Sequence, residues 1–123
     1  MDDDLRLYCV FSKEAIKLMN GNRGKIAAQS GHAFLHSFWD AEKRFPEKAE
    51  AYRLNLTRKI TLCVETTQEL FDLQKRYEPK CGVSLVKDAG FTVFTEPTVT
   101  CLGIGPIARI DCEEILSKLR PFI

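Results

Sequence analysis

The chain has 123 residues, of which 45% are hydrophobic, and its formal net charge is +1 at pH 7. This size and composition are enough to bury a core without disulfides or a metal, and they predict one domain over residues 1–123. No apolar run approaches the roughly 18 residues that a membrane span needs, and the N-terminal Met-Asp-Asp-Asp lacks the features of a secretory leader, so we expect a cytoplasmic protein.

The first half of the chain is predicted to contain one strand and two helices. Residues 5–11 form an apolar run that is typical of a buried strand, and residues 12–23 form a polar connection that ends in turn formers. A helix is expected from about residue 23 to residue 45. Pro46 interrupts it and fits the first turn of a second, short helix over about residues 46–54.

The second half is predicted to contain three strands and two helices. The residues before Tyr77 follow a threonine that can cap a helix, and the residues after Pro97 are rich in β-branched side chains. The expected elements are strands at 59–65, 83–87 and 98–104, a helix from Thr66 or Thr67 to about Tyr77, and a last helix from about Asp111.

The order of these elements, β-α-α-β-α-β-β-α, predicts an α/β fold with a small sheet of about four strands and helices on both faces. The β-α-β segments imply parallel neighbouring strands joined by right-handed crossovers. The loop between the last two strands is too short for a helical crossover, so those strands should run antiparallel. We therefore expect a mixed sheet.

The helix that begins near Gly24 carries polar side chains along one side. At about 100° per residue, Lys25, Gln29, His32 and His36 fall within a stripe about 60° wide. Such a stripe is either a solvated helix surface or one wall of a binding site. The opposite side, which is suited to packing on a sheet, consists of Ile26, Ala33, Phe34, Ser37 and Ala41.

Two large apolar side chains, Leu35 and Trp39, lie on the flank of this helix behind the polar stripe. They can pack under the short helix that begins at Pro46, or they can contact a partner such as a second copy of the chain. Of these two roles we favour packing.

Positive charge is concentrated in the half of the chain that holds this helix. Residues 5–60 contain 11 Lys and Arg against 5 Asp and Glu, whereas residues 61–123 contain 7 against 9. A local positive field can attract a polyanion such as nucleic acid even when the whole molecule is nearly neutral. A solvated surface of mixed charge would give the same counts.

The five cysteines are odd in number and lack CxxC spacing, and three of them, Cys9, Cys63 and Cys101, lie in strand-like apolar runs. We expect reduced core thiols, since a cysteine nucleophile would need a polar helper from elsewhere in the sequence. His32 and His36 are four residues apart, but no glutamate follows His32 as the zinc motif HExxH requires. We therefore expect no metal site.

A second polar segment, Asp88-Ala89-Gly90-Phe91-Thr92, follows the third predicted strand. Ligands of open α/β sheets bind at the carboxyl ends of strands, so Asp88 should lie near the helix start at Lys25. There Asp88 can serve as a general base and Lys25 can bind a phosphate or an oxyanion, although Asp88 can also simply cap its own loop. The residues alone thus indicate an anion or nucleic-acid ligand and a hydrolytic site.

Three blocks of the sequence carry a family resemblance: GKIAAQSGHA at residues 24–33, SLVKDAGFT at 84–92 and PTVTCLGIGP at 97–106. In this order they resemble the type 2 peptidyl-tRNA hydrolases of archaea and eukaryotes, over nearly the whole chain. The resemblance implies hydrolysis of the ester that joins a peptide to the 3′ end of tRNA, without a metal or an organic cofactor. It also makes a homodimer plausible.

The resemblance further implies roles for individual residues. In the implied mechanism water that is polarised by Asp88 attacks the ester carbonyl, while Lys25 offsets charge on the oxyanion or the terminal phosphate and the threonines orient the groups around them. The implied catalytic residues are Lys25, Gln29, Asp88, Thr92 and Thr100. The implied tRNA-binding residues are Arg23, Gly24, Lys25 and His32.

The chain also departs from the family pattern. Residues 12–15 read Ser-Lys-Glu-Ala where the family usually has Arg-x-Asp-Leu, the loop at residues 21–25 has a shifted glycine, and the apolar Phe91 and Val93 flank Thr92. These apolar neighbours could weaken RNA contact or retune substrate choice. Two alternatives therefore stay open: a tRNA- or RNA-binding module of the same fold with little or no turnover, and an esterase for another acyl ester.

Overall fold

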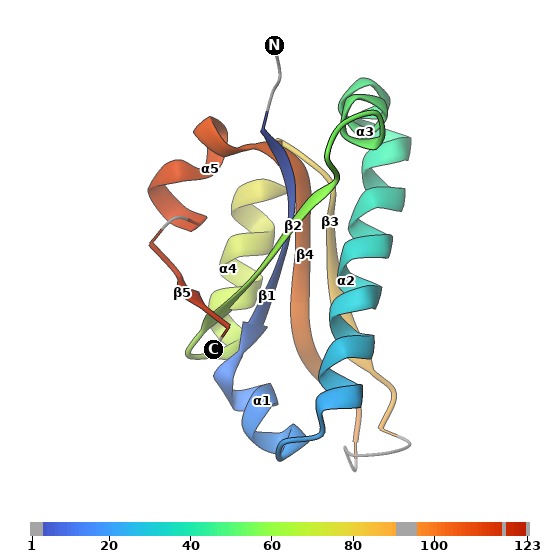
Figure 1. Ribbon diagram of the computed structural model, residues 1–123. Helices are drawn as coiled ribbons and strands as arrows, with labels where there is room; N and C mark the ends of the chain where they lie inside the picture. The colour runs from blue at the N-terminus through green and yellow to red at the C-terminus, as the bar shows by residue number, and fades with distance from the viewer. Residues whose placement is uncertain (1–3, 91–95, 117, 123) are drawn as a thin grey trace.

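The computed structural model describes residues 4–90, 96–116 and 118–122. In these residues helices cover both faces of one sheet, which confirms the expected α/β fold (Figure 1). The strands are β1 (Leu5–Ser12), β2 (Arg58–Val64), β3 (Val83–Asp88), β4 (Thr98–Ala108) and β5 (Arg120–Pro121). The helices are α1 (Lys13–Met19), α2 (Arg23–Arg44), α3 (Pro46–Arg53), α4 (Thr67–Tyr77) and α5 (Arg109–Leu116).

The sheet has the strand order β3-β4-β1-β2-β5 and is mixed, as expected. β1 pairs in parallel with β2 and antiparallel with β4, and β4 pairs antiparallel with β3. The short β5 adds a strand to the predicted four by pairing with Leu62 and Cys63. One expectation is wrong: β2 and β3 flank α4 in sequence but are not neighbours, because β4 and β1 lie between them.

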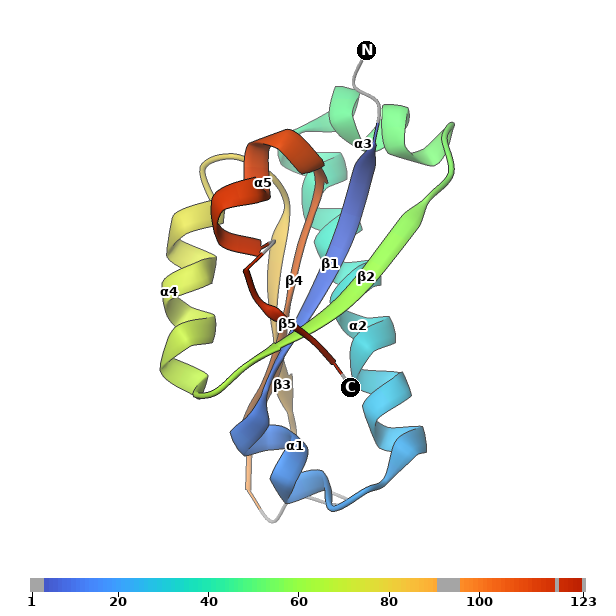
Figure 2. The same cartoon turned by 60° about the vertical axis from the view of Figure 1, so that its left-hand side comes forward.

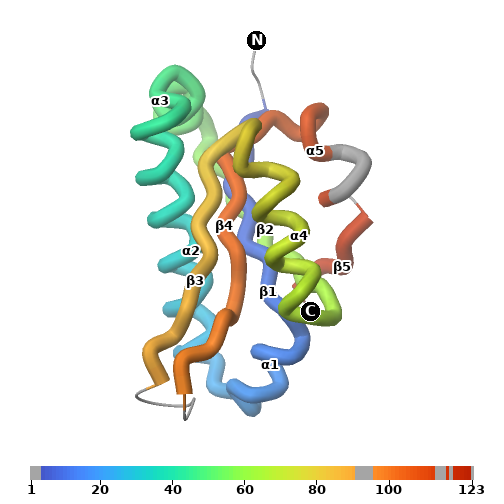
Figure 3. Tube along the Cα trace, turned by 180° about the vertical axis from the view of Figure 1, so that it is seen from behind, coloured from blue at the N-terminus to red at the C-terminus, as the bar shows by residue number. Residues whose placement is uncertain are grey.

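The two faces of the sheet carry different helices. α2 and α3 lie on one face, and α4 and α5 lie on the other (Figures 1 and 2). Side chains of β1 alternate between the two layers: Tyr8 and Val10 belong to the cluster that includes α4, whereas Cys9 and Phe11 belong to the cluster that contains Ala33 of α2. α2 begins at the end of the sheet where β3 finishes and β4 starts (Figure 3).

A short helix, α1, occupies the stretch predicted as a polar connection. The side chain of Ser12 accepts a hydrogen bond from the backbone N–H of Ala15 and so caps the helix, which buries Ala15 and Met19. Asn20 ends the helix in the left-handed conformation that asparagine tolerates. The sequence prediction missed α1 because its two buried side chains are spaced among exposed charged residues.

β4 runs to Ala108, four residues beyond the predicted end at Ile104. Gly105 and Pro106 read as strand breakers, but the register between β1 and β4 shifts at this place, where Arg6 pairs with Ile107 and Tyr8 with Ile104. Such an irregularity accommodates a proline that cannot donate to the ladder.

Among the described residues, no helix has both the length and the apolar character required to traverse a lipid bilayer.

Candidate functional site

The first turn of α2 brings a lysine to the end of the sheet. The side chain of Asn22 caps the helix by accepting a hydrogen bond from the backbone N–H of Lys25 at 3.0 Å. Arg23 and Gly24 are exposed in this first turn. The Lys25 side chain turns toward the sheet, where its Nζ lies 2.5 Å from Oδ1 of Asp88.

Asp88 is the last residue of β3 and is 8% exposed. Its Oδ2 accepts a hydrogen bond from the backbone N–H of Gly90 at 2.9 Å, in a turn where Gly90 has a φ of +89° that favours glycine. The carboxylate therefore does both things that the sequence left open: one oxygen caps its own loop and the other meets Lys25.

The surroundings of Asp88 hold the pKa of its carboxyl below the ordinary value. The largest cause is the hydrogen bond from Lys25, and the backbone N–H of Gly90 and the charges of Lys25 and His32 act in the same direction, while burial opposes them. Asp88 is therefore a carboxylate at neutral pH.

A buried amide links the carboxylate to β4. Thr100 Oγ1 donates a hydrogen bond to Gln29 Oε1 at 2.6 Å, and Gln29 Nε2 lies 3.5 Å from Asp88 Oδ1. Gln29 is 4% exposed and Thr100 is fully buried. Because the threonine hydroxyl occupies the amide oxygen, the amide NH₂ group faces the carboxylate, and the chain of donors runs from Thr100 through Gln29 to Asp88.

An extra residue in β4 aims Thr100 at this cluster. Val86 of β3 pairs with Cys101, but the next residue, Lys87, pairs with Val99, so Thr100 has no partner of its own across the strands. In a regular strand Thr100 and Cys101 would point to opposite faces. At this bulge both contact Gln29 of α2, through its side-chain oxygen and its backbone oxygen respectively.

The structure thus brings together four of the five predicted catalytic residues, namely Lys25, Gln29, Asp88 and Thr100. Thr92 and its neighbours Phe91 and Val93 lie outside the described residues. Three predicted tRNA-binding residues, Arg23, Gly24 and His32, are exposed on α2 near this cluster.

The flank of α2 meets the favoured expectation only in part. Leu35 is 46% exposed and lines a surface pocket with Tyr52 and Arg53 of α3, whereas Trp39 is 50% exposed and is not among the residues that line it. Phe38, one residue before Trp39, packs with Tyr52 of α3. The sequence could not show where α3 would cross α2.

The cysteines are buried core thiols. All five are free and buried. Burial raises the pKa of the Cys9 thiol well above its ordinary value and that of the Cys81 thiol to about 12, which disfavours a reactive thiolate at either position. Within the described ranges, no three or more His, Cys, Asp or Glu side chains gather in a group that could hold a metal ion.

The arrangement is suited to handling an anion and an electrophilic carbonyl. An ammonium group beside a helix N-terminus can bind a phosphate or a developing oxyanion, and an ionised carboxylate held by three donors can orient water. All of these groups lie where two strands and a helix meet, so the protein holds them in place before a ligand arrives.

Comparison with known proteins places the chain in a family. The family model described as peptidyl-tRNA hydrolase PTH2 matches residues 9–122. A peptidyl-tRNA hydrolase of Methanothermobacter thermautotrophicus is 36% identical over 99 residues, covering 79% of this chain and 81% of the relative. That of Thermococcus sibiricus is 35% identical over 80% of each chain, and a probable peptidyl-tRNA hydrolase 2 of Drosophila melanogaster is 31% identical over 98% of this chain and 63% of its own.

Proposed function

The chain belongs to the peptidyl-tRNA hydrolase PTH2 family, and from this membership we infer that it hydrolyses the ester bond between a peptide and the 3′ end of tRNA. The products are the free peptide and a tRNA that can be used again. The structural observation that best supports this function is the contact of Lys25 with Asp88 at the start of α2.

In the proposed reaction Asp88 positions the attacking water and Lys25 stabilises the negative charge that develops on the ester oxygen. While Lys25 is bound to it, Asp88 is a weak proton acceptor, since its pKa is held below the ordinary value. When a substrate oxyanion or phosphate draws the ammonium away from Oδ1, the basicity of Asp88 rises. Substrate binding therefore prepares the carboxylate to accept a proton from water.

Gln29 and Thr100 keep the carboxylate in position. The buried hydroxyl of Thr100 orients the Gln29 amide, and that amide faces Asp88 Oδ1. Gln29 thus remains a donor to the carboxylate when Lys25 turns to the substrate. Thr92, which the family resemblance also implicates, stays a prediction, as does tRNA binding by Arg23, Gly24 and His32.

The direct test is release of tRNA from a peptidyl-tRNA whose amino group is blocked. We expect wild-type protein to cleave it, and we expect Lys25→Ala to lower kcat by about 100-fold, the usual effect of removing an oxyanion donor. Lys75→Ala, which removes an exposed lysine from α4 on the opposite face, is the matched control and should cleave normally. Binding of tRNA without any cleavage would contradict the function and favour the non-catalytic module.

Salt dependence separates tRNA recognition from a general esterase activity. Binding through phosphates should weaken steeply as salt rises, whereas a small neutral ester should respond little. Equal turnover of a minimal aminoacyl ester without tRNA would contradict tRNA as the recognised substrate.

Two further parts of the proposal concern where and in what form the protein acts. We propose the cytoplasm, because peptidyl-tRNA arises during translation, and cell fractionation tests this. We also keep the homodimer that the resemblance makes plausible, and sedimentation of the purified protein tests it.

A further inference from the structure

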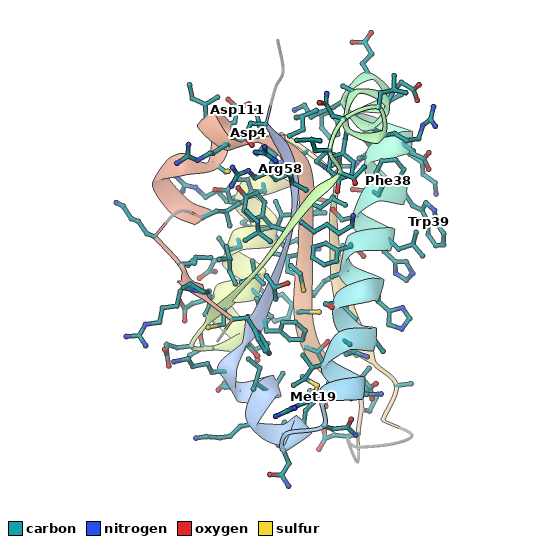
Figure 4. All side chains as sticks on the ribbon, viewed as in Figure 1. Asp4, Met19, Phe38, Trp39, Arg58 and Asp111 are labelled. Carbon is teal, nitrogen blue, oxygen red and sulfur yellow. The ribbon has the colours of Figure 1, made fainter. Side chains whose placement is uncertain are left out.

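Three exposed rings form a ladder along the outer side of α2. The rings of His32 and His36 have centroids 5.6 Å apart, and those of His36 and Trp39 are stacked at 5.2 Å with an angle of 18° between their planes. All three side chains are exposed, and Trp39 points away from the body of the protein (Figure 4). The proposed reaction uses neither His36 nor Trp39.

The ladder continues the line of the candidate active site. Spacings of four, three, four and three residues keep one series of side chains on the same side of α2: Lys25, Gln29, His32, His36 and Trp39. At 1.5 Å per residue, the ladder extends from about 10 Å to about 21 Å beyond Lys25 along the helix axis. Its first ring, His32, is near enough for its charge to act on the Asp88 carboxyl.

The charges around the ladder suit a polyanion. Lys25 lies at its beginning, and Lys43, which follows Lys25 by five full helical turns, is exposed beyond its end on the same side. The acidic residue that flanks the ladder toward β3, Asp40, forms an ion pair with Arg44 at 2.6 Å and accepts a hydrogen bond from the backbone N–H of Val83. Glu42 lies on the other flank of the helix.

Stacked rings between two lysines are the pattern of a single-stranded nucleic-acid site. Every base has a flat face that can stack on an aromatic ring, and lysines bind the phosphates between the bases. Beside this ladder the only large aliphatic side chain described as exposed on α2 is Leu35, so this surface offers flat rings and cations rather than a broad aliphatic patch.

We propose that His32, His36 and Trp39 stack the unpaired nucleotides at the 3′ end of tRNA, with the ester placed between Lys25 and Asp88 at the start of the ladder. This inference rests on the proposed function, which requires a single-stranded 3′ end to leave the cluster along some surface. By helical spacing, the outer side of α2 leads from the position of Lys25 to the ladder, while the Gln29 side chain on the same line is buried. The ladder thereby makes the nucleotides next to the ester part of what the protein recognises.

Trp39 is the single tryptophan of the chain, so its fluorescence reports directly on the ladder. The probe is a single-stranded RNA oligonucleotide that ends in CCA and carries no aminoacyl group, and a blunt RNA duplex is the control. We expect the single strand to quench Trp39 fluorescence and the duplex to quench it much less. His36→Ala should weaken binding of the single strand by about tenfold, whereas Phe71→Ala, at an exposed ring on α4, should bind as wild type.

A kinetic comparison separates recognition from chemistry. For Trp39→Ala, the ratio of kcat/KM on peptidyl-tRNA to kcat/KM on an N-blocked aminoacyl adenosine should fall by about tenfold, mainly through KM. The same ratio should be unchanged in Phe71→Ala. Thermal unfolding of each variant verifies that the fold is retained.

The outcomes distinguish the failure of the ladder from the failure of the enzymatic function. Unchanged Trp39 fluorescence at RNA concentrations that saturate binding would overturn the ladder while leaving hydrolysis intact. Quenching by the single strand without any ester cleavage would support the ladder and contradict the enzymatic function. Equal loss by Trp39→Ala on both substrates would also overturn the ladder.

Discussion

The two faces of the sheet are built on different principles. Toward α4 the layer is filled by large apolar side chains such as Leu70, Leu73 and Tyr77. Toward α2 the interface contains small residues and buried polar groups, and Ser37 Oγ hydrogen-bonds to backbone oxygens of Gly82 and Gly105. We infer that apolar volume stabilises both faces, and that the α2 face in addition holds polar groups at fixed positions.

Close approach of α2 to the sheet makes the polar cluster possible. A Cβ atom at Gly103 of β4 would collide with the backbone oxygen of Ala33 and would lie 2.9 Å from the Cβ of Ser37. Because the helix sits this near the strands, the short side chains of Thr100 and Asp88 reach Gln29. On the α4 face, large side chains fill the space between helix and sheet.

The sharpest test of this comparison is the loss of one carboxylate charge on each face. Asp88→Asn should lower kcat by about 1,000-fold, since it removes the group that orients and activates water. Asp72→Asn, on the exposed side of α4, should change kcat by less than about twofold, because its only described hydrogen bond is to Gln68. Single-turnover cleavage of peptidyl-tRNA measures both, and similar losses in the two variants would refute the assignment.

Packing can be tested by adding side-chain volume on the α2 face and by removing it on the α4 face. Gly103→Ala should destabilise the protein by about 3 kcal/mol through overpacking against α2, and it should also lower kcat because Gln29 moves with the helix. Chemical denaturation gives the stability and the cleavage assay gives kcat. A variant that loses stability but keeps full kcat would show that the helix position matters less than we infer.

Leu70→Ala is the counterpart on the α4 face. Leu70 is fully buried, so its truncation should leave a cavity and cost about 3 kcal/mol. We expect kcat per folded molecule to stay as in wild type, because no polar group of the site rests on this layer. A fall in kcat at a temperature where the variant is fully folded would contradict the inference that the site depends only on the α2 face.

Substitution of Thr100, at the bulge of β4, tests a smaller and more local effect on kcat. Thr100→Val keeps the shape but removes the hydroxyl that orients Gln29, so kcat should fall by about tenfold, the equivalent of one hydrogen bond. Thr100→Ser should restore most of the rate. If serine fails where valine fails, the effect comes from packing rather than from the hydroxyl.

The pH profile distinguishes the paired carboxylate from an ordinary one. Because the pKa of Asp88 is lowered, the acid limb of kcat/KM should lie below the ordinary aspartate pKa, and Lys25→Ala should move it upward. The sign for stability agrees: a lowered folded pKa stabilises the protein above the unfolded pKa, and that contribution disappears as pH falls through the folded pKa. An acid limb that does not move in Lys25→Ala would exclude the coupling of these two groups.

Much of the site could be predicted because its parts follow local rules. Helical spacing placed Lys25 and Gln29 on one side of a helix, and the rule that ligands bind at strand ends placed Asp88 nearby. The orientation of Thr100 could not be predicted in this way, since it depends on a one-residue shift between β3 and β4. Likewise, α1 and the full length of β4 depend on burial and on a strand irregularity that the residues themselves do not reveal.

What the sequence determined by itself is therefore the content of each element: the polar side of α2, the carboxylate at the end of β3 and the family blocks. These properties are local, because the helical and strand periods act over a few residues. Only the tertiary structure decided which elements meet. The distance between α2 and the sheet, the bulge at Thr100 and the exposure of Trp39 all depend on packing between segments far apart in the chain, which no local period encodes.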